Sequence, residues 1–519
     1  MDSRILLLTG KRAERLVRDY SSESDVETEV EVLPISIASF MNLEIVLKKL
    51  KEKNNLEKFS MVMVPGLAEF DLEEAETELG TPFFKGPKHA ADISLVLNNL
   101  NSLELSKEIP ASDLLEDEIS SGAKKFLQEI KEKYKGKIGE SDNFEIGGGE
   151  NSVFAGPDFP PRIVGEIINA PKLSNEELIE IGEKYAEEGA EILDIGMTTQ
   201  EEMSREIPRI INVLRENFDL PLSIDTTEKE EIRTALDVGI DLIVSIDGST
   251  IDYFEGLDTP AVIIPRNPEE DYYPKKRSDK IDYLEDLLEK AEKLDYERPV
   301  ADLILEPIGR DFVDSLMAFQ EFREENSKIP LFMGIGNVIE LCDADSIGMT
   351  ALLLGSANEM NVDFVLSVEA SDKTQRNISE ISTARDMMIL AKHRNSVPKD
   401  LGLDLLRFKE KRKLFDPYEK EIEKDAEVVE ASLEKEFPRD SKGFFKIFTE
   451  NEKIVAVFHS FEDSNVVIKG KTASEVADEI VDRNLISELS HATYLGRELE
   501  KAEIAIRTGR GYIQEEKLF

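Results

Sequence analysis

Short apolar runs alternate with amphipathic stretches in the N-terminal part of the chain. The runs RILLLTG, VEVLPI and SMVMVPG (residues 4–10, 30–35 and 60–66) have the length and composition of buried strands. A helix is predicted to begin at Lys11, and NLEIVLKKLKEK (residues 42–53) has the spacing of an amphipathic helix. Strands that alternate with helices are typical of a parallel, doubly wound sheet. We therefore predict a Rossmann-like α/β domain over residues 1–125.

The alternation of strands and helices is interrupted after about residue 123. A helical stretch, AKKFLQEIKEKYKG (residues 123–136), is followed by a segment rich in Gly and Pro that lacks hydrophobic periodicity. Such composition is typical of loops and linkers. We predict a helix and linker over residues 126–161, with the linker proper at residues 147–161.

From Arg162 onward the alternation becomes regular. Eight short apolar runs follow one another, and helical stretches separate most of them. The runs are RIVGEII, EILDIG, LPLSID, DLIVSIDG, PAVIIP, ADLILEP, IPLFMGIG and VDFVLSVE. This pattern is what a (β/α)8 TIM barrel requires, and we predict one over residues 162–395.

Polar residues stand at the C-terminal ends of seven of these runs, the face on which barrel active sites are built. They are Asn169, Asp194, Asp225, Asp247, Glu306, Asn337 and Glu369.

The last part of the chain changes character again. It begins with a highly charged, helix-rich stretch and continues with two strand candidates, KIVAVFH and NVVIKG (residues 453–459 and 465–470). We predict a small α+β domain over residues 396–519.

Composition narrows the classes of function. The 519 residues include 64 basic and 109 acidic ones, a net charge of −45 that repels nucleic acid and anionic lipid. A single cysteine and four histidines exclude a disulfide framework and argue against a multi-cysteine or His-rich metal site. Each long apolar stretch is broken well before the ~20 residues of a membrane span. We expect a cytoplasmic protein without nucleic-acid or membrane partners.

Four segments, in this order, resemble the pterin-binding barrel superfamily: VGEIINAP, EILDIG, LSIDTTEKEEIRTALDVGIDLIVSIDG and LILEPIG. That superfamily includes dihydropteroate synthases and methyltetrahydrofolate-dependent corrinoid methyltransferases. The resemblance spans about residues 162–393, and the outer segments resemble domains of an archaeal dihydropteroate synthase-related group in organisms that use methanopterin.

The resemblance implies a reduced pterin of the tetrahydromethanopterin or tetrahydrofolate type. Asp225 and Glu306 match the family's pterin-holding acids, and Asp194 is a further candidate. Carboxylates suit this task, because the pyrimidine edge of a pterin presents N–H donors. The pterin-binding Asn of the fourth strand is missing, with Val244 in its place, and Ser245 and Asp247 are the candidates to substitute.

A synthase must also bind and expel diphosphate. Asn169 matches the first-strand Asn, which helps to place metal and diphosphate, so it is a candidate Mg²⁺ ligand in the synthase alternative alone. The family's basic residues are replaced by residues 197–202, 336–338 and 367–369. Arg266 and Arg310 are the cations that could compensate in part, and Glu369 stands where the synthases have a His.

The segment MGIGNVIEL instead resembles the Gly-x-Ser-Asn-Val pattern of the methyltransferases, in which the Asn acts near N5 of the pterin. This makes Asn337 the candidate catalytic residue, and a helix N-cap is its structural alternative. We therefore expect a methyl transfer from an N5-methylated tetrahydropterin. Two alternatives stay open: condensation of hydroxymethyldihydropterin diphosphate with an arylamine, and a non-catalytic pterin-binding scaffold.

The methyl acceptor is not indicated. Neither flanking segment carries an Asp-x-His-x-x-Gly corrinoid signature, so a corrinoid acceptor would belong to a partner protein. By resemblance to other pterin-binding barrels, we expect a homodimer.

Overall fold

The computed structural model describes residues 4–53, 55–100, 102–135, 143–148, 152–198, 201–406, 424, 426–429, 439–461 and 464–518. By clustering of contacts the chain divides into two compact units. One unit contains Met1–Val368 and Arg376–Leu405, and the other contains Glu369–Gln375 and Leu406–Phe519. Among the helices so described, none is long and apolar enough to cross a membrane.

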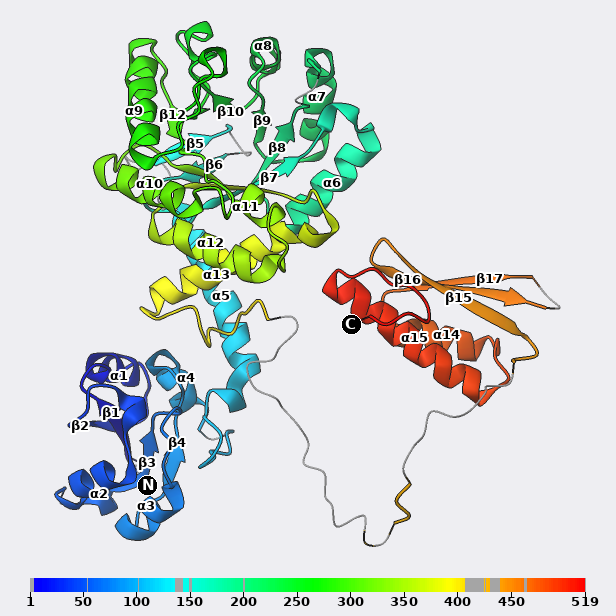
Figure 1. The fold of residues 1–519 in the computed structure, drawn as a ribbon. Coiled ribbons are helices and arrows are strands. Elements are labelled where there is room, and N and C mark those ends of the chain that lie inside the picture. Colours follow the sequence, from blue (N-terminus) through cyan, green and yellow to red (C-terminus); the bar gives the residue numbers. More distant parts are fainter. Residues whose placement is uncertain are drawn as a thin grey trace. The chain divides into compact units, whose positions relative to one another are not determined.

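The N-terminal elements form a four-stranded parallel sheet in the order β2-β1-β3-β4 (Figure 1). Its elements are β1 (Arg4–Gly10), α1 (Glu14–Ser21), β2 (Thr28–Leu33), α2 (Leu43–Lys51), β3 (Phe59–Val64), α3 (Leu72–Leu79), β4 (Phe83–Lys85) and α4 (Ile93–Asn98). The three predicted strands are all present. The short β4 adds a fourth, so the predicted Rossmann-like α/β class is confirmed.

The helix α5 (Glu116–Lys135) begins before the boundary expected after residue 125. Its residues Ala123 and Leu127 share an apolar cluster with Ile389, Leu390 and Leu401. The helix therefore packs against the last helix of the barrel, which explains why it is longer than a linker helix needs to be.

Eight parallel strands form the barrel, in the order β12-β11-β10-β9-β8-β7-β14-β13. They are β7 (Arg162–Ile167), β8 (Ile192–Gly196), β9 (Leu222–Asp225), β10 (Leu242–Ile246), β11 (Ala261–Ile263), β12 (Pro299–Ala301), β13 (Phe332–Gly334) and β14 (Phe364–Val368). A parallel bridge between Ala301 and Leu331 joins β12 to β13 and closes the ring. The predicted TIM barrel is confirmed.

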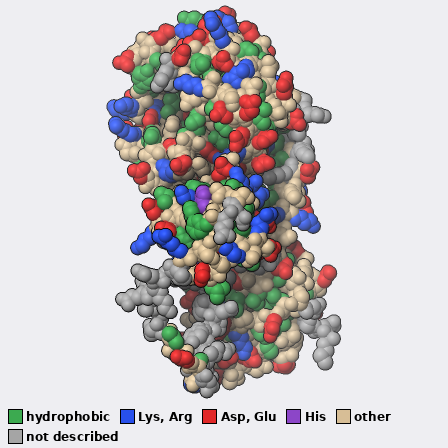
Figure 2. All heavy atoms as spheres, turned by 90° about the vertical axis from the view of Figure 1, so that its right-hand side faces the viewer, with side chains coloured by type: hydrophobic (Ala, Val, Ile, Leu, Met, Phe, Trp, Pro, Cys, Tyr) green, Lys and Arg blue, Asp and Glu red, His purple; other side chains and the backbone are tan. Residues whose placement is uncertain are grey.

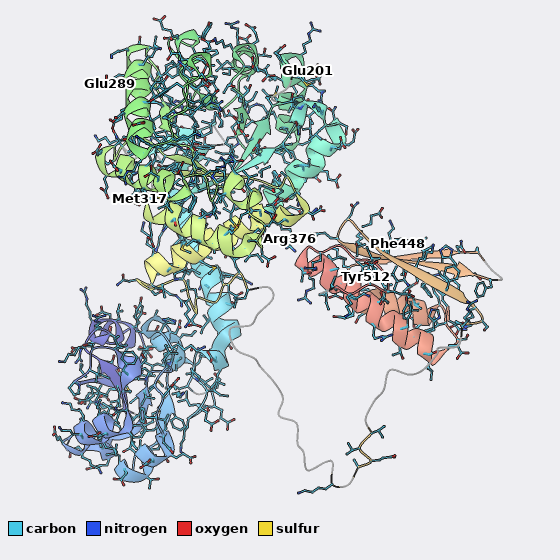
Figure 3. The ribbon with its side chains drawn as sticks, in the orientation of Figure 1. Glu201, Glu289, Met317, Arg376, Phe448 and Tyr512 are labelled. Atoms are coloured by element: carbon cyan, nitrogen blue, oxygen red, sulfur yellow. The ribbon has the colours of Figure 1, made fainter. Side chains whose placement is uncertain are left out.

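Helices surround the strands on the outside (Figure 1). They are α6 (Asn175–Glu188), α7 (Ile207–Asn217), α8 (Lys229–Val238), α9 (Arg277–Lys293), α10 (Phe312–Glu325), α11 (Gly336–Glu340), α12 (Ser346–Glu359) and α13 (Asn377–His393). Local signals delimit them: Ser174 and Glu177 form a capping box at the start of α6, and Gly189 ends this helix at φ +105°. In Figure 3, Glu289 on α9 and Met317 on α10 lie on the outer surface of this ring.

The lumen of the barrel changes character along its axis. Its amino-terminal end is filled by an apolar cluster that includes Val164, Ile192, Leu242, Val262, Val300, Phe332 and Phe364. Two residues farther along β7 and β8, on the same inward face, the side chains are polar: Glu166 and Asp194. A polar layer thus lies on an apolar floor.

A β-hairpin covers the amino-terminal end of this lumen. It consists of β5 (Phe144–Ile146) and β6 (Val153–Ala155), and Ile146 and Ala155 belong to the apolar cluster of the floor. The stretch expected to be a linker, residues 147–161, therefore contains a strand that packs on the barrel. The hairpin escaped prediction because each of its strands has only three residues.

The sixth barrel strand also differs from the prediction. ADLILEP was expected to be this strand, but the ladder ends at Ala301. The backbone turns at Ile304, whose φ of +58° is uncommon for a β-branched residue. The following residues leave the strand direction and form the rim of the barrel.

The C-terminal unit contains an antiparallel sheet of order β15-β16-β17, with β15 (Gly443–Glu450), β16 (Lys453–Ser460), β17 (Val466–Gly470), α14 (Ala473–Asp482) and α15 (Leu489–Thr508). The α+β class is confirmed, with three strands instead of the two expected. The additional strand, β15, carries Phe on both faces. Phe445 is buried against the helices, whereas Phe448 is half exposed (Figure 3), which hides the alternation. Most of the charged stretch before it lies outside the described residues.

The surface reflects the acidic composition. Figure 2 shows acidic side chains interspersed with Lys and Arg over the visible face. Several charges are paired, for example Lys290 with Asp252 at 2.6 Å. Exposed pairs of this kind contribute little each.

Ile146→Ala tests the hairpin as the floor of the barrel. Ile146 is fully buried, so removing its side chain should lower the free energy of unfolding by about 2–5 kcal/mol in urea denaturation followed by circular dichroism. Leu352→Ala, at a position on α12 that is 69% exposed, is the matched control and should change it by less than about 0.5 kcal/mol. Equal effects of the two substitutions would contradict the assignment.

Candidate functional site

The carboxyl ends of the barrel strands bring the predicted site residues to one rim. Asp194 lies within β8 and Asp225 ends β9, and both belong to the polar layer of the lumen. The others follow the strands: Asn169 after β7, Asp247 after β10, Glu306 after β12, Asn337 in the first turn of α11 and Glu369 directly after β14. Asp194 and Asp247 are buried, whereas Asn169 and Asn337 are exposed.

Three acids from adjacent strands approach one another most closely. Glu166 on β7 pairs in register with Asp194 on β8, and Asp225 lies two residues beyond the β9 partner of Asp194. One carboxylate oxygen from each lies within 4.8 Å of the others. We call Glu166, Asp194 and Asp225 the carboxylate cluster.

Two serines orient the cluster from neighbouring strands. The Ser223 hydroxyl donates to Oδ1 of Asp194 at 2.5 Å, and the Ser245 hydroxyl donates to Oδ1 of Asp225 at 2.7 Å. Ser245 adopts φ +76°, a left-handed conformation that is uncommon outside glycine. Oδ2 of Asp194 is buried and has no hydrogen-bond partner among the described residues. Asp194 and Asp225 are therefore each held by a serine, and one buried oxygen of Asp194 is left without a hydrogen-bond partner among the described residues.

Burial and mutual repulsion favour protonation of these acids. Burial, followed by the charge of Asp225, raises the pKa of Glu166 to about 7. Burial raises the pKa of Asp194 well above its ordinary value, and the charges of Asp225 and Glu166 add to the effect. Burial also raises the pKa of Asp225, against the opposing hydrogen bond of Ser245 and charge of Arg266. Perturbed acids that converge on one cavity are typical of functional sites.

A fourth acid, Asp302, is buried after β12 and accepts a hydrogen bond from the backbone N–H of Ile304 at 2.7 Å. Burial raises the pKa of Asp302 to about 7, with opposing contributions from the Ile304 N–H and Lys280 and a supporting one from Asp225. This group therefore exchanges its proton near neutral pH.

Ser245 and Asp247, the candidates to replace the missing Asn, are both engaged elsewhere. The Ser245 hydroxyl is donated to Asp225. Asp247 accepts from the Ser249 hydroxyl at 2.6 Å and from Nε of Arg266 at 3.1 Å. The structure thus uses Asp247 to anchor the loop after β10, and Arg266 is paired with it.

Glu306 is held by a lysine that sequence reasoning missed. Nζ of Lys280, on α9, donates to Oε1 of Glu306 at 2.7 Å and to the carbonyl oxygens of Leu303 and Ile304 at 3.3 and 2.9 Å. The Lys280 side chain is 1% exposed. This lysine fixes both the carboxylate and the turn at Ile304.

A signal for Lys280 exists in the sequence. Its position lies four, seven and eleven residues before Leu284, Leu287 and Ala291, which form the buried stripe of α9. A lysine on a buried stripe requires a partner. Glu166 and Asp302 were missed as well. Glu166 is a charge at an inward position of the strand RIVGEII, which is an equally unusual place.

The remaining candidate residues lie outside the carboxylate cluster. Arg310 is exposed in the turn before α10, and Asn337 is exposed at the start of α11. Asn169 has φ +51° and makes no side-chain cap to the turn that follows it. These residues follow the carboxyl ends of the strands, so they could contact a ligand in the lumen from the rim.

Comparisons with known families agree with this architecture. A family described as "Pterin binding enzyme" matches residues 169–281, which confirms the resemblance found in the sequence. The family PterinBD-DUF4346 matches residues 439–515, and a family of unknown function, DUF6513, matches residues 3–88.

One relative matches over nearly the whole length. The uncharacterized protein MJ0107 of Methanocaldococcus jannaschii is 38% identical over 535 residues, covering 99% of this chain and 99% of that protein. A dihydropteroate synthase of Streptococcus pyogenes serotype M3 is 27% identical over 173 residues, which cover 30% of this chain and 63% of the synthase. The dihydropteroate synthase of Synechocystis is 41% identical over 75 residues, 14% of this chain and 24% of that protein.

Among solved structures, the chain is similar to the Xanthomonas albilineans dihydropteroate synthase in complex with 7,8-dihydropteroate. The TM-score is 0.38 at 20% identity, and the match covers 45% of this chain and 93% of that chain.

Asp302→Asn tests the raised pKa of this buried carboxyl group. Because the pKa of Asp302 is raised to about 7 in the folded protein, the wild type should lose stability as pH rises from about 4 to about 7. The variant cannot ionise there, so its stability relative to the wild type should increase by up to about 4 kcal/mol between pH 4 and pH 8. Urea unfolding at several pH values measures this.

Asp282→Asn, on the exposed face of α9, is the control and should show no such pH-dependent difference. Identical pH profiles for Asp302→Asn and the wild type would show that Asp302 does not titrate as its burial requires.

Proposed function

The chain belongs to the family of the Methanocaldococcus jannaschii protein MJ0107, and we propose that its pterin-binding barrel holds a reduced pterin for methyl transfer from N5. The pterin is of the tetrahydromethanopterin or tetrahydrofolate type. The observation that carries this proposal is the acidic lumen, beside which Arg266 and Lys280 are already paired with carboxylates.

The pterin would be held by its N–H donors. Asp225 ends β9 in the lumen, and Glu306 stands on the rim with its carboxylate fixed by Lys280. Both acids match the pterin-holding positions of the resembling barrels. Charge-assisted hydrogen bonds from the pyrimidine edge would satisfy Asp225, whose charge otherwise repels Glu166 and Asp194. An electron-rich, N–H-bearing heterocycle therefore suits this lumen.

Diphosphate fits the same lumen poorly. Arg266 is paired with Asp247 and Lys280 with Glu306. Ser367, where the synthases place a basic residue, is buried and donates to Oδ1 of Asn377 at 2.6 Å. An anion among buried carboxylates experiences repulsion that low effective dielectric strengthens. These contacts argue against a diphosphate-expelling reaction.

Methyl transfer needs no phosphate subsite. N5 becomes a better leaving group when a proton or a hydrogen bond stabilises it in the transition state. Asn337, exposed at the start of α11, is the residue proposed for this task. A corrinoid carried by a partner protein is the proposed methyl acceptor.

The synthase alternative rests on one observation, the similarity of barrel segments to proteins named dihydropteroate synthase. In that case Asn169 would help to hold Mg²⁺ with the diphosphate. A pterin-binding scaffold without catalysis is the outcome if neither reaction occurs.

Asp225→Asn should weaken pterin binding. Losing the charge of one partner in a buried, charge-assisted hydrogen bond costs about 2–5 kcal/mol, or about 30-fold or more in Kd. Isothermal titration calorimetry with tetrahydrofolate and tetrahydromethanopterin, each with and without N5-methyl, measures the affinity.

The matched control is Asp286→Asn on the exposed face of α9, which should bind like the wild type. Unchanged pterin affinity in a folded Asp225→Asn variant would remove Asp225 from the binding site.

Turnover separates the two reactions. With N5-methyl-tetrahydropterin as donor and cob(I)alamin as acceptor, the wild type should transfer the methyl group, and Asn337→Ala should slow the transfer by about 10²-fold. Asn217→Ala, at the exposed end of α7, is the control and should leave the rate unchanged.

The opposing assay uses hydroxymethyldihydropterin diphosphate, Mg²⁺ and p-aminobenzoate. Diphosphate release at about 1 s⁻¹ or faster would contradict the methyltransferase proposal and favour the synthase. Pterin binding without either turnover would favour the scaffold.

A further inference from the structure

We propose that the carboxylate cluster of Glu166, Asp194 and Asp225 binds one divalent metal cation through carboxylate oxygens. The three side chains come from three adjacent strands of the barrel and enter the same lumen. This site is distinct from Asn169, the residue through which the resemblance suggested a metal, and it shares Asp225 with the pterin contact proposed above.

The spacing suits one cation. Oxygen ligands of Ca²⁺ lie at about 2.3–2.6 Å from the metal and those of Mg²⁺ at about 2.0–2.1 Å, so ligands across one ion are about 4–5 Å apart. The three oxygens of the cluster lie within 4.8 Å of one another. Each comes from a β-strand and not from a loop, so the spacing is fixed by the barrel itself.

A second observation points to a ligand at the same place. Asp194 is 0% exposed and lies on β8, between Glu166 on β7 and Asp225 on β9. Its Oδ1 atom accepts from Ser223, but its Oδ2 atom is buried without a hydrogen-bond partner. A buried carboxylate oxygen without a partner is costly, and a bound cation would satisfy it.

Sharing protons among the three acids accounts for the arrangement less well. Carboxyl groups that share a proton form a short O–H···O bond of about 2.5–2.7 Å. Among the hydrogen bonds of these three side chains, those of Asp194 and Asp225 go to serines, and none joins two members of the cluster. The serines instead each hold one carboxylate oxygen of Asp194 and of Asp225, as second-shell groups do around metal ligands.

Among the described residues, no ion pair joins a cation to the cluster. Arg266 and Lys280, whose charges act on Asp225 and Asp302, form ion pairs with Asp247 and Glu306. The donor atoms of the cluster are all oxygens, which favours the hard cations Mg²⁺, Mn²⁺ and Ca²⁺ over Zn²⁺ or copper.

Mn²⁺ is the probe, because its electron paramagnetic resonance signal distinguishes free from bound ion and it takes the same oxygen ligands as Mg²⁺. The full chain, stripped with EDTA, is titrated in high salt, which screens the exposed acidic surface. We expect one Mn²⁺ bound per chain, and in crystals soaked with Mn²⁺ an anomalous peak between the three carboxylates.

Variants assign the ligands. Glu166→Gln and Asp194→Asn should each weaken Mn²⁺ binding by about tenfold or more, and Ser223→Ala, which frees Asp194 to turn, by a similar factor. Asp282→Asn, on the exposed face of α9 and outside the cluster, is the matched control and should leave Mn²⁺ affinity unchanged.

Absence of a stoichiometric site in the wild type up to about 1 mM Mn²⁺ would overturn the inference without recourse to any variant. So would an anomalous peak elsewhere, or equal affinity in the wild type and folded Glu166→Gln and Asp194→Asn. Pterin affinity is measured separately in EDTA. Pterin binding without Mn²⁺ binding refutes only the metal site, and the reverse result refutes only the proposed function.

Discussion

Repulsion among closely spaced carboxylates is the constraint on which the carboxyl-terminal half of the barrel lumen depends. Glu166, Asp194 and Asp225 lie within a few ångströms of one another, and Asp302 is buried nearby. Burial away from water is the main cause that raises the pKa of Glu166 and of Asp302 to about 7, and the charge of Asp225 adds to it. A ligand with N–H donors or positive charge relieves this repulsion, and an anion increases it. The chemistry proposed for the site follows from that asymmetry.

Contacts elsewhere in the barrel offset the free-energy cost of this acidic lumen. The hairpin β5–β6 and the apolar floor supply packing that does not depend on the acids. Ser223 and Ser245 each donate to one carboxylate oxygen, and Lys280 on α9 makes Glu306 part of an ion pair. Left-handed backbone at Ser245 and Ile304 occurs beside these contacts, at the ends of β10 and β12. Strained backbone near a ligand site is maintained when the surroundings overdetermine it, as these contacts do.

Much of the architecture could be predicted from alternation alone, because a strand buried on both faces reads as a short apolar run. Asp225 and Glu306 could be predicted as candidates because each follows an apolar run whose carboxyl end belongs to the rim of a barrel. Glu166 was missed because it lies within a strand, and Lys280 because a charge on a helix normally faces solvent. The early end of the sixth strand could not be predicted, because the left-handed backbone at Ile304 has no sequence signature. The ion pair between Asp247 and Arg266 depends on the geometry of loops, which the hydrophobic pattern of the sequence does not predict.

The most direct measurement is a crystal structure of the full chain with a bound reduced pterin. The account predicts the pyrimidine edge within hydrogen-bond distance of the Asp225 and Glu306 carboxylates, in the lumen above the apolar floor. It also predicts the N5 side of the ring toward Asn337. A pterin bound outside the barrel, or one whose pyrimidine edge faces neither acid, would contradict the account.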